Sequence, residues 1–124
     1  MAKRSLISVV DDDESVRESL EGLMKSVGLA VKVFASAEEF LKSDRMSDTD
    51  CLILDVRLPG IDGMELHRHL LASQSAIPVI FITAHGSDEE MRASALAKGA
   101  VAYLMKPLDA EELLNVIRRA LGAK

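Results

Sequence analysis

The chain has 124 residues and a formal net charge of −5, so it has the size of one domain and lacks the excess of cations that binding to nucleic-acid phosphates requires. Hydrophobic residues make up 48%, which is enough for a buried core and argues against disorder, while three Phe, one Tyr and no Trp leave few platforms for stacked bases. No apolar run approaches the length of a membrane span, and Cys51 is the single cysteine. We therefore expect one cytoplasmic domain, residues 1–124, that binds neither nucleic acid nor membrane directly.

Short apolar runs alternate with amphipathic stretches along the sequence. The runs predict strands at residues 6–10, 30–34, 51–54, 78–82 and 101–105. Helical spacing, capping boxes and glycine stops predict helices at 14–27, 36 to about 41, 63–71, 87–99 and 109–121. Strict alternation requires crossover connections, so the fold class is α/β with a parallel, doubly wound sheet that has helices on both faces.

The residues that follow the strands decide the function of such a fold, because ligands bind beyond the carboxyl ends of parallel strands. The polar residues at these ends are Asp11, Asp12, Asp13, Asp55, Thr83 and Lys106. One Asp after a strand is most often a helix cap or a turn residue. Such residues at four separate strand ends are instead expected to form one polar site.

Clustered carboxylates need a cation, because two like charges about 4 Å apart repel by roughly 4 kcal/mol at an effective dielectric constant near 20. Oxygen ligands with open positions suit Mg²⁺ or Mn²⁺, which bind alongside phosphate. Lys106 and Thr83 offer an ammonium and a hydroxyl to phosphoryl oxygens. A carboxylate, a divalent ion and a lysine are the groups that phosphoryl transfer needs.

Four segments of the sequence carry a family resemblance. They are VVDDDESVR at 9–17, LDVRLPGIDG at 54–63, FITA at 81–84 and YLMKP at 103–107. Together they resemble the receiver domain of bacterial two-component response regulators, most of all that of FixJ-type transcriptional regulators. The resemblance covers nearly the whole chain and implies a (βα)5 flavodoxin-like fold with strand order 2-1-3-4-5.

The resemblance implies that Asp55 is the phosphorylated residue. Asp12, Asp55 and the backbone carbonyl of Arg57 would then bind Mg²⁺ or Mn²⁺ directly, and Asp11 would bind it through water. The triple Asp leaves the register of the acidic pair open between Asp11–Asp12 and Asp12–Asp13.

The same resemblance assigns Thr83, Ala84 and Lys106 to phosphoryl binding and Tyr103 to a switch that rotates from exposed to buried when Thr83 moves inward. It also implies a cis bond before Pro107. The spacing from Thr83 to Lys106 is one residue longer than is usual in the family, and we place the extra residue within 86–90. Arg57 and His85 occupy positions at which family members vary and tune the lifetime of the phosphoryl group.

The function that the resemblance implies is a phosphoacceptor switch that is not a turnover enzyme. Its partners would be a histidine kinase or phosphotransfer protein and, after phosphorylation, a second copy bound through the fourth helix, fifth strand and fifth helix. Its output would be transcription through a DNA-binding domain outside this chain, or protein contact by a single-domain receiver. A rival is a phosphohydrolase of the haloacid-dehalogenase type that uses Asp11 and Asp13, although Ser15 departs from the Thr or Val usual there.

Three further expectations concern residues outside this site. His67 and His69 lie two apart on a predicted helix and cannot bind one metal together, so both are expected on a solvated face. Cys51 lies within a strand and is expected to be buried and unreactive. The methionines, Met91 and Met105 among them, are expected to fill the core.

Overall fold

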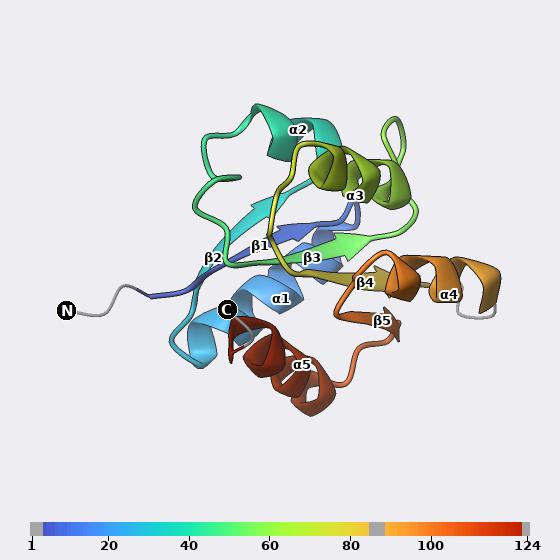
Figure 1. Ribbon diagram of the computed structural model, residues 1–124. Helices are drawn as coiled ribbons and strands as arrows, with labels where there is room; N and C mark the ends of the chain where they lie inside the picture. The colour runs from blue at the N-terminus through green and yellow to red at the C-terminus, as the bar shows by residue number, and fades with distance from the viewer. Residues whose placement is uncertain (1–3, 85–88, 123–124) are drawn as a thin grey trace.

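Five strands and five helices alternate along residues 4–84 and 89–122, which are the residues that the computed structural model describes (Figure 1). The strands are β1 (Leu6–Val10), β2 (Ala30–Phe34), β3 (Cys51–Asp55), β4 (Val79–Thr83) and β5 (Ala102–Met105). The helices are α1 (Glu14–Ser26), α2 (Ala37–Lys42), α3 (Gly63–Ala72), α4 (Glu89–Ala97) and α5 (Ala110–Gly122). All four strand pairings are parallel and give the order β2-β1-β3-β4-β5, which confirms the predicted fold class.

Most predicted boundaries agree with the structure to within one or two residues. Ser36 caps α2 as predicted, since its hydroxyl accepts the N–H of Glu39 at 3.1 Å while Glu39 Oε1 accepts the N–H of Ala35 at 3.0 Å. Strand β4 begins at Val79, one residue later than predicted. Pro78 has no N–H to donate to a neighbouring strand, although its carbonyl still accepts from Leu52 at 2.9 Å.

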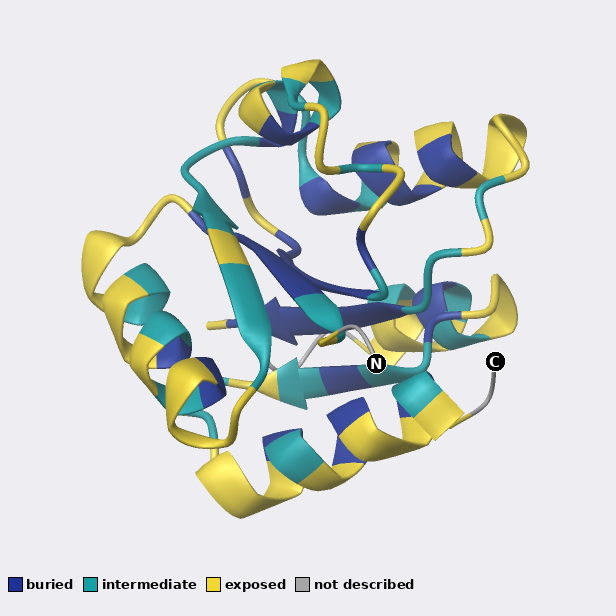
Figure 2. Ribbon diagram, turned by 90° about the vertical axis from the view of Figure 1, so that its left-hand side faces the viewer, coloured by how far each residue is buried: buried dark blue, intermediate teal, exposed yellow. Residues whose placement is uncertain are grey.

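The sheet separates two apolar layers. Helices α2, α3 and α4 pack on one face, and α1 and α5 pack on the other (Figure 1). Strands β1, β3 and β4 are almost wholly buried, whereas the edge strand β2 is half-buried, and most exposed residues lie in loops and on the outer sides of the helices (Figure 2). Burial on both faces explains why the strands are continuous apolar runs.

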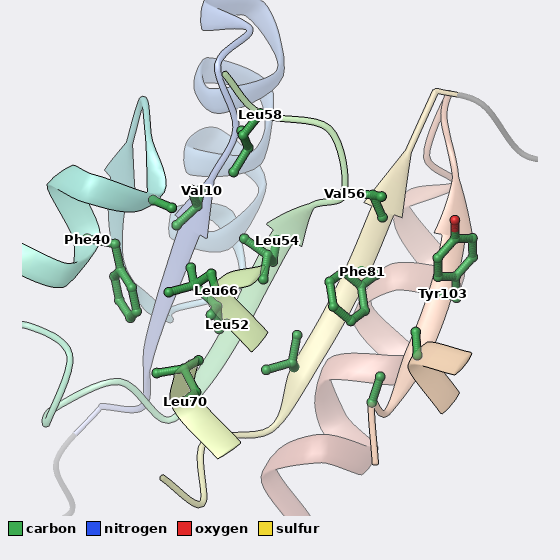
Figure 3. Packing of buried hydrophobic residues seen from close by; sticks show 14 residues of the cluster. Val10, Phe40, Leu52, Leu54, Val56, Leu58, Leu66, Leu70, Phe81 and Tyr103 are labelled. Atoms are coloured by element: carbon green, nitrogen blue, oxygen red, sulfur yellow. The ribbon is translucent and has the colours of Figure 1, made fainter. Parts of the chain in front are cut away.

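The layer beneath α2 and α3 fixes the strand ends that bear the polar residues. Phe40 of α2 and Leu66 of α3 belong to the same core cluster as Leu52 and Leu54 of β3, and all four side chains are fully buried (Figure 3). Each such side chain contributes roughly 1.5–3 kcal/mol by its removal from water. Cys51 is also fully buried, as predicted.

Two predictions about the core are wrong. His67 is only 3% exposed, because it shares the inward face of α3 with Gly63, Leu66 and Leu70 at helical spacing. Met105 is 56% exposed at the end of β5. Met91, by contrast, packs against the core from α4. Among the described helices, none combines the length and the apolar character that crossing a membrane requires.

Candidate functional site

The chain leaves β1 through a turn in which Asp11 is fixed from several sides. Its backbone N–H donates to the carbonyl of Phe34 at 3.1 Å, and its carbonyl accepts from the Arg17 guanidinium at 2.8 Å. Its Oδ1 atom accepts the N–H of Asp13 at 2.9 Å, and the residue is fully buried. These contacts hold the Asp11 carboxylate at the carboxyl edge of the sheet.

The triple Asp divides between two tasks. Asp13 caps α1, since its Oδ1 atom accepts the N–H of Ser15 at 2.9 Å and the Ser15 hydroxyl at 2.7 Å. These hydrogen bonds, that of the hydroxyl first, hold the pKa of Asp13 below its usual value. Asp13 therefore faces the helix terminus, and it is Asp11 and Asp12 that lie with Asp55.

Carboxylates from two strand ends form one cluster. Asp11, Asp12 and Asp55 each offer an oxygen atom within 4.8 Å of the others. Asp11 and Asp55 are buried, whereas Asp12 is exposed at the rim. The cluster forms because β1 and β3 are adjacent and parallel, with Val10 paired with Leu54, so that both strands end at the same height.

Lys106 joins this cluster from the end of β5. Its Nζ atom lies 2.9 Å from Asp11 Oδ2 and donates to Asp55 Oδ2 at 3.3 Å. Burial opposes the charged ammonium, but hydrogen bonding and the charges of the two carboxylates outweigh it, so the pKa of Lys106 is raised. Among the described residues, Lys106 thus contacts two of the three carboxylates in the cluster.

The two oxygens of Asp55 have different surroundings. Oδ1 accepts the N–H of Arg57 at 3.1 Å, and Oδ2 faces Lys106. Burial first, and the charge of Asp11 second, raise the pKa of Asp55 in spite of these two donors. Three close carboxylates with one ammonium leave negative charge uncompensated, and an all-oxygen donor set of this kind fits a hard divalent cation such as Mg²⁺.

Thr83 lies at the adjacent strand end. Its side chain is buried, and its carbonyl accepts the N–H of Lys106 at 2.8 Å, which ties β4 to the residue that bears the ammonium. The bond between Lys106 and Pro107 is cis, and Ala84 is exposed. His85 and most of the expected insertion at 86–90 lie outside the described residues.

Tyr103 is paired with Phe81 of β4 and lies on the face of the sheet that α4 covers. The residue is 8% exposed, and its ring packs beside Phe81, with ring centroids 6.2 Å apart (Figure 3). The structure therefore has Tyr103 in the inward position, the position that we expected after the switch.

Two residues around the site, and the burial of a third residue in the core, were not expected from the sequence. Arg17 donates to the backbone carbonyl of Asp11. Its position in the first turn of α1, directly after the triple Asp, could have indicated this contact. Glu38 contacts the loop after Asp55, where its Oε2 atom accepts the N–H of Ile61 at 3.1 Å, and no local spacing signals that contact. His67 packs edge-on against Phe81 at 5.3 Å, and its spacing with Leu66 and Leu70 could have revealed its burial.

Comparison with known proteins gives a consistent result. The family model described as the response regulator receiver domain matches residues 7–118. The response regulator protein TodT of Pseudomonas putida is 44% identical over 119 residues, which are 96% of this chain and 52% of that protein. The transcriptional regulatory protein FixJ of Azorhizobium caulinodans is 41% identical over 116 residues, which are 94% of this chain and 54% of that protein.

Among solved structures, the crystal structure of FixJ-N superposes with a TM-score of 0.84 at 36% identity and covers 98% of this chain and 96% of the other. The chain spans about half the length of the curated relatives it matches. A family model that extends over most of the sequence and relatives above 40% identity show that the chain belongs to the response regulator receiver domains.

Proposed function

We propose that the chain is a phosphoacceptor switch in which Asp55 receives a phosphoryl group. The observation that carries this proposal is that Asp11, Asp12, Asp55 and Lys106 meet at the carboxyl edge of the sheet, with Lys106 Nζ 3.3 Å from Asp55 Oδ2. The cluster holds an accepting carboxylate, oxygen ligands for a divalent cation and an ammonium for a phosphoryl oxygen. Membership of the receiver family supports the same assignment.

The proposed metal ligands are Asp12, Asp55 and the backbone carbonyl of Arg57, with Asp11 acting through water. When bound, Mg²⁺ or Mn²⁺ would neutralise the carboxylates and the charge that develops on the phosphoryl oxygens. Asp12 is the exposed member of the cluster. Its carboxylate could therefore move to bind the cation with the least disturbance of the surrounding structure.

In the proposed transfer, an Asp55 carboxylate oxygen attacks phosphorus, a P–O bond forms, and the P–N bond to the donor histidine breaks. Lys106 stays charged, because its pKa is raised. Its ammonium would exchange its contact with the Asp55 carboxylate for one with a phosphoryl oxygen. The Thr83 hydroxyl and the backbone at Ala84 would contact the remaining phosphoryl oxygens. Phosphorylation replaces one charge by roughly −2, which draws Thr83 inward and favours the inward position of Tyr103.

The partners that we propose are a histidine kinase or a phosphotransfer protein. An apolar groove between α1 and α5 supports a protein partner because it opens beside Lys106, and its lining includes Val16, Leu20, Leu23 and Leu108. The output that we propose, by analogy with FixJ, is control of transcription in the cytoplasm. We also propose that phosphorylation promotes a dimer through α4, β5 and α5. The chain would not turn over a substrate in the manner of a phosphohydrolase.

The test is phosphorylation with acetyl phosphate and Mg²⁺, followed by intact-mass spectrometry and site mapping. We expect one phosphoryl group on the unmodified chain and none on Asp55→Asn. Label that persists in Asp55→Asn but disappears in Asp11→Asn would contradict the proposal and favour the haloacid-dehalogenase alternative.

A further inference from the structure

Helix α2 contacts the loop that follows the proposed phosphoacceptor. Glu38 lies in the first turn of α2, where an acidic residue is already favourable for the helix dipole. Its side chain nevertheless reaches away from the helix, and its Oε2 atom accepts the N–H of Ile61, 23 residues further along the chain, at 3.1 Å. The contact joins two elements and is not a local cap.

Gly60 adapts the loop to this contact. Its φ of +73° lies in the left-handed region that favours glycine. A Cβ atom on Gly60 would overlap the Oε2 atom of Glu38, so the carboxylate occupies the space that a side chain would need. The hydrogen bond and the close approach together place the Glu38 carboxylate against the backbone of residues 60 and 61.

Stability alone is a poor explanation for this arrangement. The second oxygen of Glu38, Oε1, is buried and makes no hydrogen bond within residues 4–84 and 89–122. A buried carboxylate oxygen without a donor loses solvation without recovering it, whereas an outward rotamer would leave both oxygens in water. The contact is therefore better explained by what it does to the loop.

The loop that Glu38 holds is one wall of the proposed metal site. It begins at Arg57, whose N–H donates to Asp55 Oδ1 at 3.1 Å, and it ends where the N–H of Gly63 donates to the carbonyl of Val56 at 3.0 Å. Asp12 shares one cavity with residues of this loop, among them Arg57, Leu58 and Pro59. Both ends of the loop are fixed by hydrogen bonds of backbone N–H groups, one to the Asp55 side chain and one to the Val56 carbonyl, and Glu38 fixes its middle.

We infer that Glu38 is a positioning residue that holds the loop in the conformation that presents the Arg57 carbonyl to a divalent cation. This inference rests on the proposed function, because that carbonyl is a ligand only if the acidic cluster binds the cation. Glu38 itself touches neither the cation nor the phosphoryl group. It acts through the backbone from Ile61 to Arg57.

The experiment is an Mg²⁺ titration of the full chain by backbone NMR without a phosphodonor, together with amide hydrogen exchange at Ile61. Loss of groups that orient metal ligands typically weakens binding 10- to 100-fold, so we expect about tenfold weaker Mg²⁺ binding by Glu38→Ala and faster exchange at Ile61. Glu38→Gln keeps a carbonyl oxygen that can accept from Ile61, and its affinity should stay within about twofold of the unmodified chain.

Glu39→Ala is the matched control. Glu39 is the next residue of the same helix, and it also accepts a backbone N–H, but that of Ala35 at the start of α2. Its removal should lower the stability of α2 and leave Mg²⁺ affinity unchanged. Should Glu38→Ala fail to fold, Glu38→Asp retains the charge, withdraws the carboxylate from Ile61, and should weaken Mg²⁺ binding in the same way.

The outcomes separate this inference from the function on which it rests. Unmodified Mg²⁺ affinity in Glu38→Ala, with faster exchange at Ile61, would overturn the inference and leave the proposed function standing. Equal losses in Glu38→Gln and Glu38→Ala would also overturn it, because charge and not hydrogen bonding would then matter. A chain that binds no Mg²⁺ at Asp12 and Asp55 would overturn both.

Discussion

The Lys106 ammonium lies nearer to Asp11 than to Asp55, with Nζ–Oδ2 distances of 2.9 and 3.3 Å. It lies between two buried carboxylates, but without a divalent ion its single charge balances only one of the three negative charges in the cluster. Neither of its ion pairs includes Asp12. Asp12 is therefore the carboxylate whose repulsion the metal-free protein compensates least.

Replacing Asp12 by Asn should raise stability without metal and remove Mg²⁺ binding. The substitution keeps the shape of the side chain and deletes one charge within 4.8 Å of two others. Because Asp12 is exposed, we expect a gain of about 1 kcal/mol, the repulsion of unit charges about 4 Å apart in water. Urea unfolding in EDTA and in Mg²⁺ measures both effects.

Asp13→Asn is the control for that experiment, since Asn can still cap α1 and Asp13 lies outside the cluster. It should neither raise stability in EDTA nor weaken Mg²⁺ binding. Equal or lower stability of Asp12→Asn in EDTA would contradict the electrostatic account of the site.

Gly63→Ala should destabilise the fold. A Cβ atom at this position would overlap the backbone carbonyl oxygen of Asp55, which cannot rotate away as a side chain could. We expect a loss of about 3 kcal/mol, the upper part of the range for overpacked sites. Gly22→Ala in α1 meets no atom within 4 Å and should gain up to about 1 kcal/mol from helix propensity. Thermal unfolding of both variants measures these changes. A Gly63→Ala variant as stable as the unmodified chain would contradict the close approach of residue 63 to the Asp55 carbonyl.

Stability should fall as the pH falls below 6.5 because of His67. Burial first, and the charge of Lys98 second, lower its pKa from the ordinary value of 6.5. Between the lowered folded pKa and 6.5, the unfolded chain binds more protons than the folded one, so the free energy of unfolding increases with pH and is fully regained above 6.5. Its slope reaches at most about 1.4 kcal/mol per pH unit for one proton.

His67→Leu removes the titrating group while keeping an apolar side chain against Phe81. Chemical unfolding from pH 5 to 8 should show a smaller slope for this variant. His69→Gln on the exposed side of α3 serves as the control and should leave the slope unchanged. The same slope in His67→Leu and in the unmodified chain would rule out His67 as its source.

The fold could be predicted because its signals are local and repeated. Each strand is an apolar run, each helix has a helical spacing, and strict alternation permits a parallel sheet. The meeting of Asp55 with Lys106 follows from the same topology, since parallel strands end at one edge. For this part of the site, sequence order and strand direction were sufficient.

The rest of the site depends on contacts that no local pattern encodes. Asp11, Asp12 and Asp13 are chemically identical, and only the turn geometry decides that Asp13 is the cap of α1. The hydrogen bond from Ile61 to Glu38 joins residues 23 apart. His67 was misassigned because it was compared with His69, two residues away, and not with Leu70 on its own face of α3.

Tyr103 offers a direct measurement of the switch, because it is the single tyrosine of a chain without tryptophan. Tyrosine fluorescence therefore reports on this ring alone. Its inward position beside Phe81 is the state that phosphorylation should favour, since an inward Thr83 leaves room behind it. Beryllofluoride with Mg²⁺ mimics the phosphoryl group and should reduce quenching of Tyr103 by iodide.

Thr83→Ala should abolish this change, because the variant has no hydroxyl to follow the phosphoryl oxygens. A differential binding energy of about 1.4 kcal/mol would alter the ratio of inward to outward Tyr103 tenfold, which quenching can detect. Thr49→Ala removes another buried hydroxyl, one paired with Ser8 at 2.6 Å just before the amino end of β3, and should keep the full response. The Thr83 hydroxyl is the one contact with the phosphoryl group that this variant lacks. A response in Thr83→Ala equal to that of the unmodified chain would therefore show that Tyr103 moves independently of Thr83 and would contradict the proposed switch.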